Sequence, residues 1–142
     1  MIRKLLLTTL LASGLTTGLL AAAPSKTELV ASYAKISAAL AADDLAAAKT
    51  AAADFAGKAT AADKKALAEK ATLIAKAPKI ESARDNFKGL STAVEPLAAG
   101  EKDFVVMNCP MAAADWVQAK GAVKNPYFGK SMLSCGAPKQ AQ

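Results

Sequence analysis

Between Ser25 and Gly100 the apolar residues recur every three or four positions in four successive stretches. This spacing places them on one face of an α-helix, so the pattern predicts four amphipathic helices. Their apolar faces consist of Leu29, Tyr33, Ile36 and Leu40, then Leu45, Ala48, Ala52 and Phe55, then Leu67, Ala71 and Ile74, and finally Ile80, Ala83, Phe87, Leu90, Val94 and Leu97. Short joints are typical of antiparallel neighbours, so we expect an all-α fold, a four-helix up-and-down bundle.

Residues with special backbone preferences indicate where these helices begin and end. Ser25 and Glu28 have the spacing of a capping box, in which a hydroxyl and a carboxylate satisfy the first backbone N–H groups. Asp44 can cap the second helix in the same way. Gly57 is expected to end that helix, and residues 60–63 are expected to open the third.

The helical pattern stops after the fourth stretch, and a different kind of segment follows. Residues 104–107 form a short β-branched run that favours an extended conformation. Residues 111–120 are expected to form a short helix within a cap of short helices and turns, residues 104–136. Bundle and cap together make one domain, residues 24–136, and residues 137–142 are expected to be a flexible tail.

Residues 1–23 have the composition of a secretory signal peptide. Arg3 and Lys4 supply a positive start, residues 5–20 an apolar core, and residues 21–23 are small alanines before the cut. The apolar run is short for a membrane span, so we expect cleavage and no stable membrane insertion afterwards. The sequence therefore predicts a periplasmic or secreted protein.

The composition excludes several kinds of function. The chain contains no histidine, which excludes histidine zinc sites, Ser-His-Asp or Cys-His catalysis and histidine acid–base chemistry. We therefore expect a protein that is not an enzyme. The formal net charge of +6 comes from lysines scattered along the predicted helices, without an arginine cluster or interleaved aromatic residues. Nucleic-acid binding is not predicted from such a surface.

Both cysteines and three of the four methionines lie in the predicted cap, at Met107, Cys109, Met111, Met132 and Cys135. Thiolate and thioether sulfurs prefer soft ions such as Cu(I) and Ag(I), which need only a few ligands. The alternation of the first three residues would point their sulfurs to one side of an extended segment. The last two would share one face of a helical turn. These five residues are the candidate metal site.

The same two cysteines could instead be joined to each other. An exported protein with two cysteines commonly carries one disulfide. A Cys109–Cys135 bond would close a loop of roughly 27 residues and stabilise the fold by about 3 to 3.5 kcal/mol in the loop-entropy model. The methionines would then be packing residues. Both interpretations stay open, and they are compatible, because a reversible disulfide could release metal ligands on reduction.

Four short motifs follow one another in the cap. They are Cys109-Pro110-Met111-Ala112, Trp116, Asn125-Pro126-Tyr127-Phe128-Gly129 and Met132-Leu133-Ser134-Cys135-Gly136. Their order and spacing resemble an uncharacterised family of exported bacterial domains of unknown function. The helical part shares weaker features with that family, namely Tyr33, the pattern of residues 40–44 and the stretch of residues 83–90.

Domains of that family occur alone or appended to the periplasmic adaptor subunits of copper/silver efflux systems. The resemblance therefore implies heavy-metal handling and a partner in an efflux system or elsewhere in the periplasm. We expect an exported accessory protein that binds Cu(I) or Ag(I); the alternative is a disulfide-stabilised interaction module without metal. Five cap residues are expected to be structural: Trp116, Asn125, Pro126, Tyr127 and Gly129.

Overall fold

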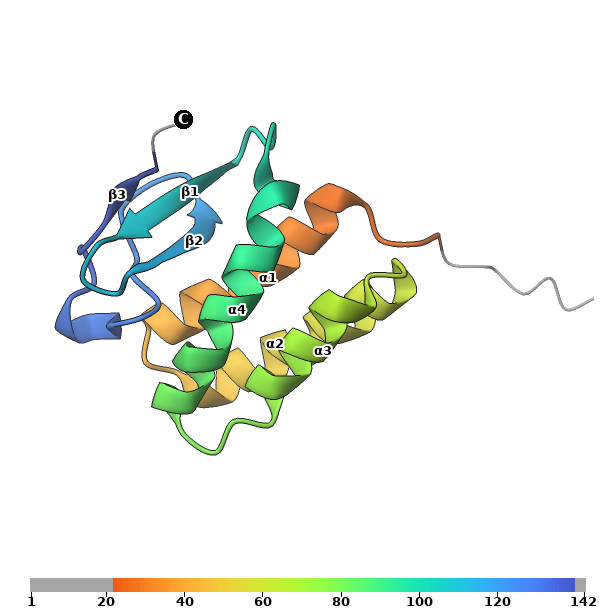
Figure 1. The fold of residues 1–142 in the computed structure, drawn as a ribbon, viewed down its shortest axis with the longest axis horizontal. Coiled ribbons are helices and arrows are strands. Elements are labelled where there is room, and N and C mark those ends of the chain that lie inside the picture. The colour runs from red at the N-terminus through yellow and green to blue at the C-terminus, as the bar shows by residue number, and fades with distance from the viewer. Residues whose placement is uncertain (1–21, 140–142) are drawn as a thin grey trace, which may run out of the picture.

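Four helices in succession are followed by a small sheet that packs at one side of them (Figure 1). The computed structural model describes residues 22–139, so the predicted signal peptide lies outside the described residues except for Ala22 and Ala23. The elements are α1 (Lys26–Ala41), α2 (Leu45–Ala61), α3 (Lys65–Ala75), α4 (Ile80–Ala98), β1 (Phe104–Cys109), β2 (Ala114–Ala119), the short 3-10 helix η1 (Gly129–Ser131) and β3 (Ala137–Pro138).

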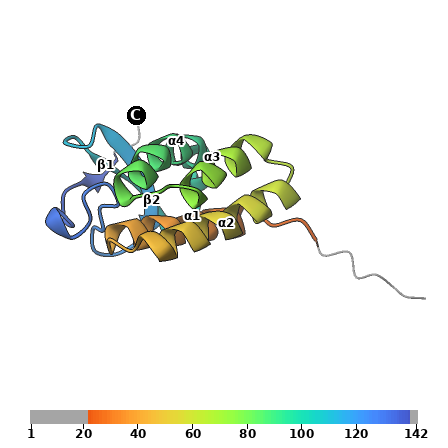
Figure 2. The same ribbon diagram turned by 90° about the horizontal axis from the view of Figure 1, so that it is seen from below.

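The prediction of four helices is confirmed, and their apolar faces form the core. Each helix packs against the next, and α4 also contacts α1. Figure 2 shows α1 and α2 in one layer and α3 and α4 in a second. Fully buried alanines such as Ala52 and Ala83 let the helices approach closely, while Tyr33 and Phe87 supply large buried areas. No helix within residues 22–139 is long and apolar enough to cross a membrane.

The predicted caps of the first two helices are confirmed. Ser25 Oγ accepts a hydrogen bond from the Glu28 N–H at 3.2 Å, and the Ser25 N–H donates to the Glu28 carboxylate at 2.7 Å. Asp44 accepts from the Ala47 N–H at 2.9 Å at the start of α2. Both caps satisfy N–H groups that have no partner inside their helix.

Two of the predicted helix boundaries are wrong. α2 does not end at Gly57 but continues to Ala61, and α3 begins at Lys65 rather than within residues 60–63. Glycine inside a helix costs only about 0.5 to 1 kcal/mol relative to alanine. Ala59, in the added turn of α2, is fully buried in the core. Packing of this turn therefore outweighs the local preference of Gly57.

The all-α prediction is wrong, because the segment after α4 forms a three-stranded antiparallel sheet in the order β2-β1-β3. β1 and β2 pair along their whole length, with Phe104 opposite Ala119 and Cys109 opposite Ala114. β3 pairs with the other edge of β1, where Ala137 lies opposite Asn108. The protein is therefore a mixed helix-and-sheet fold.

The short helix predicted over residues 111–120 is replaced by a turn and by β2. Trp116 and Gln118 are two residues apart and so lie on one face of the strand, where Trp116 Nε1 donates to Gln118 Oε1 at 3.1 Å. Val117, on the opposite face, is buried as well, and β2 packs against α1 and α4. A strand covered on both faces loses the alternation that identifies it in a sequence, which explains the wrong prediction.

Arg84 of α4 joins the cap to the helices. Its guanidinium donates to the carbonyl oxygens of Pro126 at 2.8 Å and Leu40 at 2.9 Å and to Asp43 Oδ1 at 2.5 Å. Gly129 has a positive φ of 56°, and a Cβ there would overlap the Asp43 carboxylate and the Arg84 guanidinium. The close approach of the cap at this point therefore requires glycine.

The end of the chain is attached to the sheet, although residues 137–142 were expected to be a flexible tail. Ala137–Pro138 form β3, and the Lys139 N–H donates to the Val106 carbonyl oxygen at 2.8 Å. The Lys139 ammonium lies 2.7 Å from Asp115 and 2.6 Å from Glu95. The hydrogen bonds that the ammonium donates to Asp115 and Glu95 raise the pKa of Lys139. Residues 140–142 lie outside the described residues.

We expect Asp43→Asn to destabilise the protein at neutral pH, with a loss that fades in acid. Hydrogen bonds from Arg84 and from the Lys130 N–H hold the pKa of the Asp43 carboxyl below its ordinary value. Such a group contributes stability above its unfolded pKa of about 3.9, and the contribution disappears as the pH falls through the folded-state pKa. Urea unfolding across this pH range should show the two midpoints converging at low pH.

Asp63→Asn is the matched control. Asp43 and Asp63 both follow a helix with positive φ, 61° and 55°, a conformation that asparagine also tolerates. Within residues 22–139 only the first of these aspartates forms an ion pair. The same pH-independent shift of the urea midpoint in both variants would contradict the proposed contribution of Arg84.

Candidate thiol site

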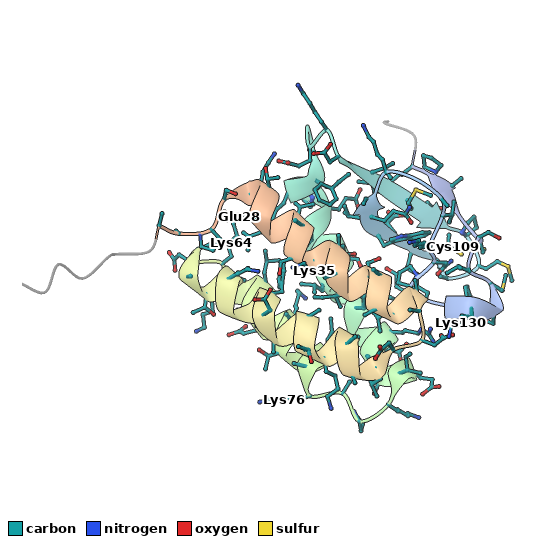
Figure 3. All side chains as sticks on the ribbon, turned by 180° about the vertical axis from the view of Figure 1, so that it is seen from behind. Glu28, Lys35, Lys64, Lys76, Cys109 and Lys130 are labelled. Atoms are coloured by element: carbon teal, nitrogen blue, oxygen red, sulfur yellow. The ribbon has the colours of Figure 1, made fainter. Side chains whose placement is uncertain are left out.

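The two cysteines meet where the end of the chain returns to the sheet. Cys109 is the last residue of β1, and Cys135 lies just before β3. Pairing of β3 with β1 brings them together, and their Sγ atoms are 3.1 Å apart. Both are free thiols; Cys109 is fully buried and Cys135 is half-buried. Figure 3 shows Cys109 beside the sheet.

The distance of 3.1 Å between the sulfurs suits a thiol–thiol contact. A disulfide has a sulfur–sulfur bond of about 2.05 Å, so forming one requires an approach of about 1 Å. With metal–sulfur bonds of about 2.3 Å, as in zinc thiolates, a metal between the two sulfurs requires them to lie about 4 to 4.6 Å apart. Movement of about 1 Å in either direction therefore converts this contact into a disulfide or a metal-binding pair.

A tight turn follows Cys109. Residues 110–113 join β1 to β2, and the Ala113 N–H donates to the Pro110 carbonyl oxygen at 3.1 Å. The backbone N–H groups of Met111 and Ala112 in this turn act to lower the pKa of the Cys109 thiol.

These donors change the acidity of the Cys109 thiol. Burial acts to raise its pKa. Hydrogen bonds from the Cys135 thiol and the Ala112 N–H oppose this effect, and the Asn125 amide and the Met111 N–H add to them. The balance lowers the pKa of Cys109 below its ordinary value, so the reactive thiolate is favoured there.

Cys135 has the opposite shift. Its hydrogen bond to Cys109 raises the pKa of the Cys135 thiol, and burial and the charge of Cys109 raise it further. The next residue, Gly136, has a φ of 140°, and a Cβ there would lie 2.5 Å from Trp116 Cη2. This close packing on Trp116 fixes the chain beside Cys135. The pair therefore consists of one thiol poised to ionise and one poised to keep its proton.

Asn125 holds the segment that carries Cys135. Its side chain is fully buried, and Nδ2 donates to the Cys135 carbonyl oxygen at 2.6 Å. Oδ1 accepts from the N–H groups of Tyr127 at 2.8 Å and Phe128 at 3.3 Å. The backbone N–H of Asn125 donates to the Leu133 carbonyl oxygen at 2.8 Å. One residue therefore connects the turn after β2 with the irregular segment that carries Cys135.

A buried aromatic cluster connects the cap to α1 and α4. The rings of Tyr33 and Phe87 stack at 5.1 Å, Phe87 lies 5.8 Å from Tyr127, and Tyr127 meets Trp116 edge-on at 6.0 Å. Ser91 Oγ lies 2.6 Å from the Tyr33 hydroxyl and accepts from the Tyr127 hydroxyl at 3.2 Å. Burial raises the pKa of both tyrosines, so their hydroxyls stay protonated.

The three methionines of the predicted metal site lie in different surroundings. Met107, two residues before Cys109 on β1, is 2% exposed, whereas Met111 in the turn is 68% exposed. Met132 is half-buried, and its carbonyl oxygen accepts from the Cys135 N–H at 3.0 Å. Within residues 22–139 no group of three or more His, Cys, Asp or Glu side chains could hold a metal ion. A metal at this site would therefore depend on sulfur ligands.

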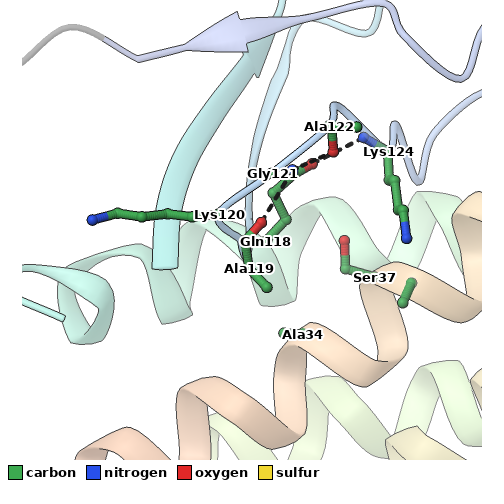
Figure 4. A pocket seen from close by; sticks show the side chains of 9 residues that line it. Ala34, Ser37, Gln118, Ala119, Lys120, Gly121, Ala122 and Lys124 are labelled. Carbon is green, nitrogen blue, oxygen red and sulfur yellow. Dashed lines mark hydrogen bonds between the residues drawn. The ribbon is translucent and has the colours of Figure 1, made fainter. Parts of the chain in front are cut away.

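A second concave feature lies between α1 and the loop of residues 120–124 (Figure 4). It is a hollow of about 310 Å³. Gln118 holds the loop: Nε2 donates to the Ala122 carbonyl oxygen, and Oε1 accepts from the Lys124 N–H, both at 3.0 Å. The lining residues are Ala34, Ser37, Ala38, Gln118, Ala119, Lys120, Gly121, Ala122 and Lys124. They include neither a thiol nor a carboxylate, so the hollow offers less chemistry than the thiol pair.

The sequence pattern did not single out Arg84 and Lys88, the two residues of α4 that bind the cap. Arg84 is the only arginine of the chain besides Arg3, and this was a usable signal, because arginine can make several fixed bonds at once. Lys88 also contacts the site, since its ammonium donates to the Ala112 carbonyl oxygen at 3.1 Å and lies 5.8 Å from the Tyr127 ring centroid. Lys88 is one of many lysines in the chain, so its residue type alone did not indicate a special role.

Comparison with known proteins identifies one family. The family described as "Protein of unknown function (DUF3347)" matches residues 29–104. The match begins in the first turn of α1, covers α2, α3 and α4, and ends at the first residue of β1, before both cysteines. No curated protein and no solved structure matches the chain.

We expect Asn125→Ala to destabilise the protein by about 2 to 4 kcal/mol, because several buried polar groups lose their partners. These groups include the Cys135 carbonyl oxygen and the Tyr127 N–H. Urea unfolding measures the change. Asn86→Ala is the control: Nδ2 of Asn86 donates to the Leu73 carbonyl oxygen at 3.3 Å at an exposed position, so its loss should cost about 0.5 kcal/mol or less. Equal losses in the two variants would contradict the role assigned to Asn125.

Proposed function

We propose that this chain, which belongs to the family DUF3347 of proteins of unknown function, is an exported accessory protein that binds Cu(I) or Ag(I). The proposed ligands are the thiolates of Cys109 and Cys135. The observation that carries the proposal is the contact of these two thiols at 3.1 Å, beside backbone and amide donors that favour ionisation of Cys109. Thiolate is the form that binds metals, and soft monovalent ions need few ligands.

The surroundings of the pair suit a metal that accepts two sulfurs. Cys135 lies in an irregular segment between η1 and β3, so an opening of about 1 Å requires no strand of the sheet to separate. Among the methionines, the exposed Met111 and the half-buried Met132 are the candidates for a third ligand. Met107, which is almost completely buried, is the candidate with the least freedom to move. Zinc is disfavoured because the chain has two thiols and no histidine.

The proposed biological role is heavy-metal handling outside the cytoplasm. It is supported by the resemblance of the motifs between Cys109 and Gly136 to exported domains that also occur on copper/silver efflux adaptors. We propose a component of such an efflux system, or another periplasmic protein, as the partner that receives the metal. The signal-peptide composition of residues 1–23 supports export.

A second candidate function follows from the same contact. An approach of about 1 Å would join the sulfurs as a disulfide, which is common in exported proteins. The protein would then be a disulfide-stabilised interaction module without metal. Thiol counting on protein taken from its native compartment separates the two candidates. Fully oxidised cysteines together with no copper uptake would leave only the interaction module.

We expect the reduced protein to bind one Cu(I) in competition with a chelator, and ligand substitutions to weaken that binding. Cys109→Ser and Cys135→Ser should each lower the affinity by about 100-fold or more, because loss of an outer-shell partner alone costs about 10- to 100-fold. Met111→Leu should lower it by about tenfold if its thioether completes the site. Equilibrium competition titration under anaerobic conditions measures all three.

Lys49→Ala, a substitution on α2 outside the cap, is the control and should leave the affinity unchanged. Met107→Leu and Met132→Leu identify any further ligand by the same titration. Equal Cu(I) affinity in the cysteine variants and in Lys49→Ala would exclude the proposed site.

A further inference from the structure

We propose that the cysteine pair also undergoes thiol–disulfide exchange, with Cys135 as the thiol that meets an incoming disulfide and Cys109 as the thiol that resolves the mixed disulfide. This inference goes beyond metal binding and does not depend on it. It rests on two features of the pair, namely unequal exposure and direct contact of the sulfurs.

The unequal exposure decides which sulfur reacts first. Cys109 is 0% exposed, closed in by the sheet and by its own turn, whereas Cys135 is half-buried at the edge of the cap. Exchange requires the attacking thiolate to reach a disulfide sulfur directly, so access decides the rate as well as acidity does. The residues just before Cys135, Leu133 and Ser134, are exposed and leave room for the attached group.

The contact between the sulfurs makes the second step intramolecular. With Cys109 Sγ 3.1 Å from Cys135 Sγ, the resolving thiol is already within reach of the sulfur that it must attack. Pre-positioned reacting atoms at about 3 to 3.5 Å gain a large rate advantage over a second molecule from solution. A mixed disulfide at Cys135 should therefore be short-lived in the wild-type protein.

The exchange takes place in two steps. Cys135 loses its proton to solvent, and its thiolate attacks one sulfur of a disulfide R–S–S–R. The bond between the two R–S groups breaks, and the released R–S thiolate is protonated by solvent. Cys109 then loses its proton to solvent, and its thiolate attacks Cys135 Sγ and displaces the second R–S group, which is protonated by solvent. Two electrons have passed from the protein dithiol to the disulfide, which leaves as two thiols.

Reaction of the reduced full-length protein with glutathione disulfide tests the proposal. Cys109→Ser should accumulate a stable mixed disulfide at Cys135, detected by mass spectrometry of the intact protein. Cys135→Ser should be modified at least about tenfold more slowly, because its remaining thiol is buried. The wild type should release two glutathione thiols per protein and end as an intramolecular disulfide.

A second measurement uses the wild-type protein alone, so its result does not depend on whether the variants fold. Native wild-type protein treated with limiting iodoacetamide should be alkylated first at Cys135, as read by peptide mapping. Faster modification of Cys109 in either experiment, or a wild type that stops at the mixed disulfide, would overturn the proposal. No step involves a metal, so exchange without copper binding, or copper binding without exchange, separates this proposal from the proposed function.

Discussion

The relative position of the two thiols depends on the hydrogen bonds of the buried Asn125 side-chain amide. Its Nδ2 donates to the Cys135 carbonyl oxygen, and its Oδ1 accepts from the N–H groups of Tyr127 and Phe128. A buried amide that loses these partners would leave several polar groups unsatisfied, each at a cost of about 1 to 3 kcal/mol. The Asn125 side chain therefore holds the beginning of this irregular segment, at residue 125, next to its end, at Cys135.

The helices act as a platform for this arrangement. Arg84 and Asp43 receive the turn at Pro126 and Gly129, and Ser91 binds the Tyr127 hydroxyl. The platform residues lie within residues 29–104, the part matched by the family, whereas both thiols lie beyond it. The matched region therefore contains the helical support, and the thiol pair lies in the part of the chain that the family model does not match.

The sequence predicted the helices, which depend on neighbouring residues, and missed the strands, which depend on contacts between residues far apart in the chain. The helical periodicity around Tyr33 and Phe87 is a property of neighbouring residues, so the four helices could be found. The strand around Trp116 could not be found in this way. The helices and the C-terminal segment cover both of its faces, so its sequence lacks the alternation of apolar and polar residues. β3 has only two residues, and the chain beside it also forms ion pairs from Lys139 to carboxylates that are distant in the sequence. Chemical type alone suggested five sulfurs, yet it could not distinguish the buried Met107 from the exposed Met111.

The donors around Cys109 indicate which state of the pair the fold favours. A thiolate gains from each N–H directed at it, whereas a disulfide sulfur carries no charge and accepts only weakly. Groups that stabilise the reduced form make the corresponding disulfide more oxidising, as in the strongly oxidising thiol–disulfide proteins. A purely structural disulfide gains nothing from the backbone N–H groups of Met111 and Ala112 or from the Asn125 amide. These groups therefore favour the thiolate form of Cys109 over the thiol, and both metal binding and exchange use that form.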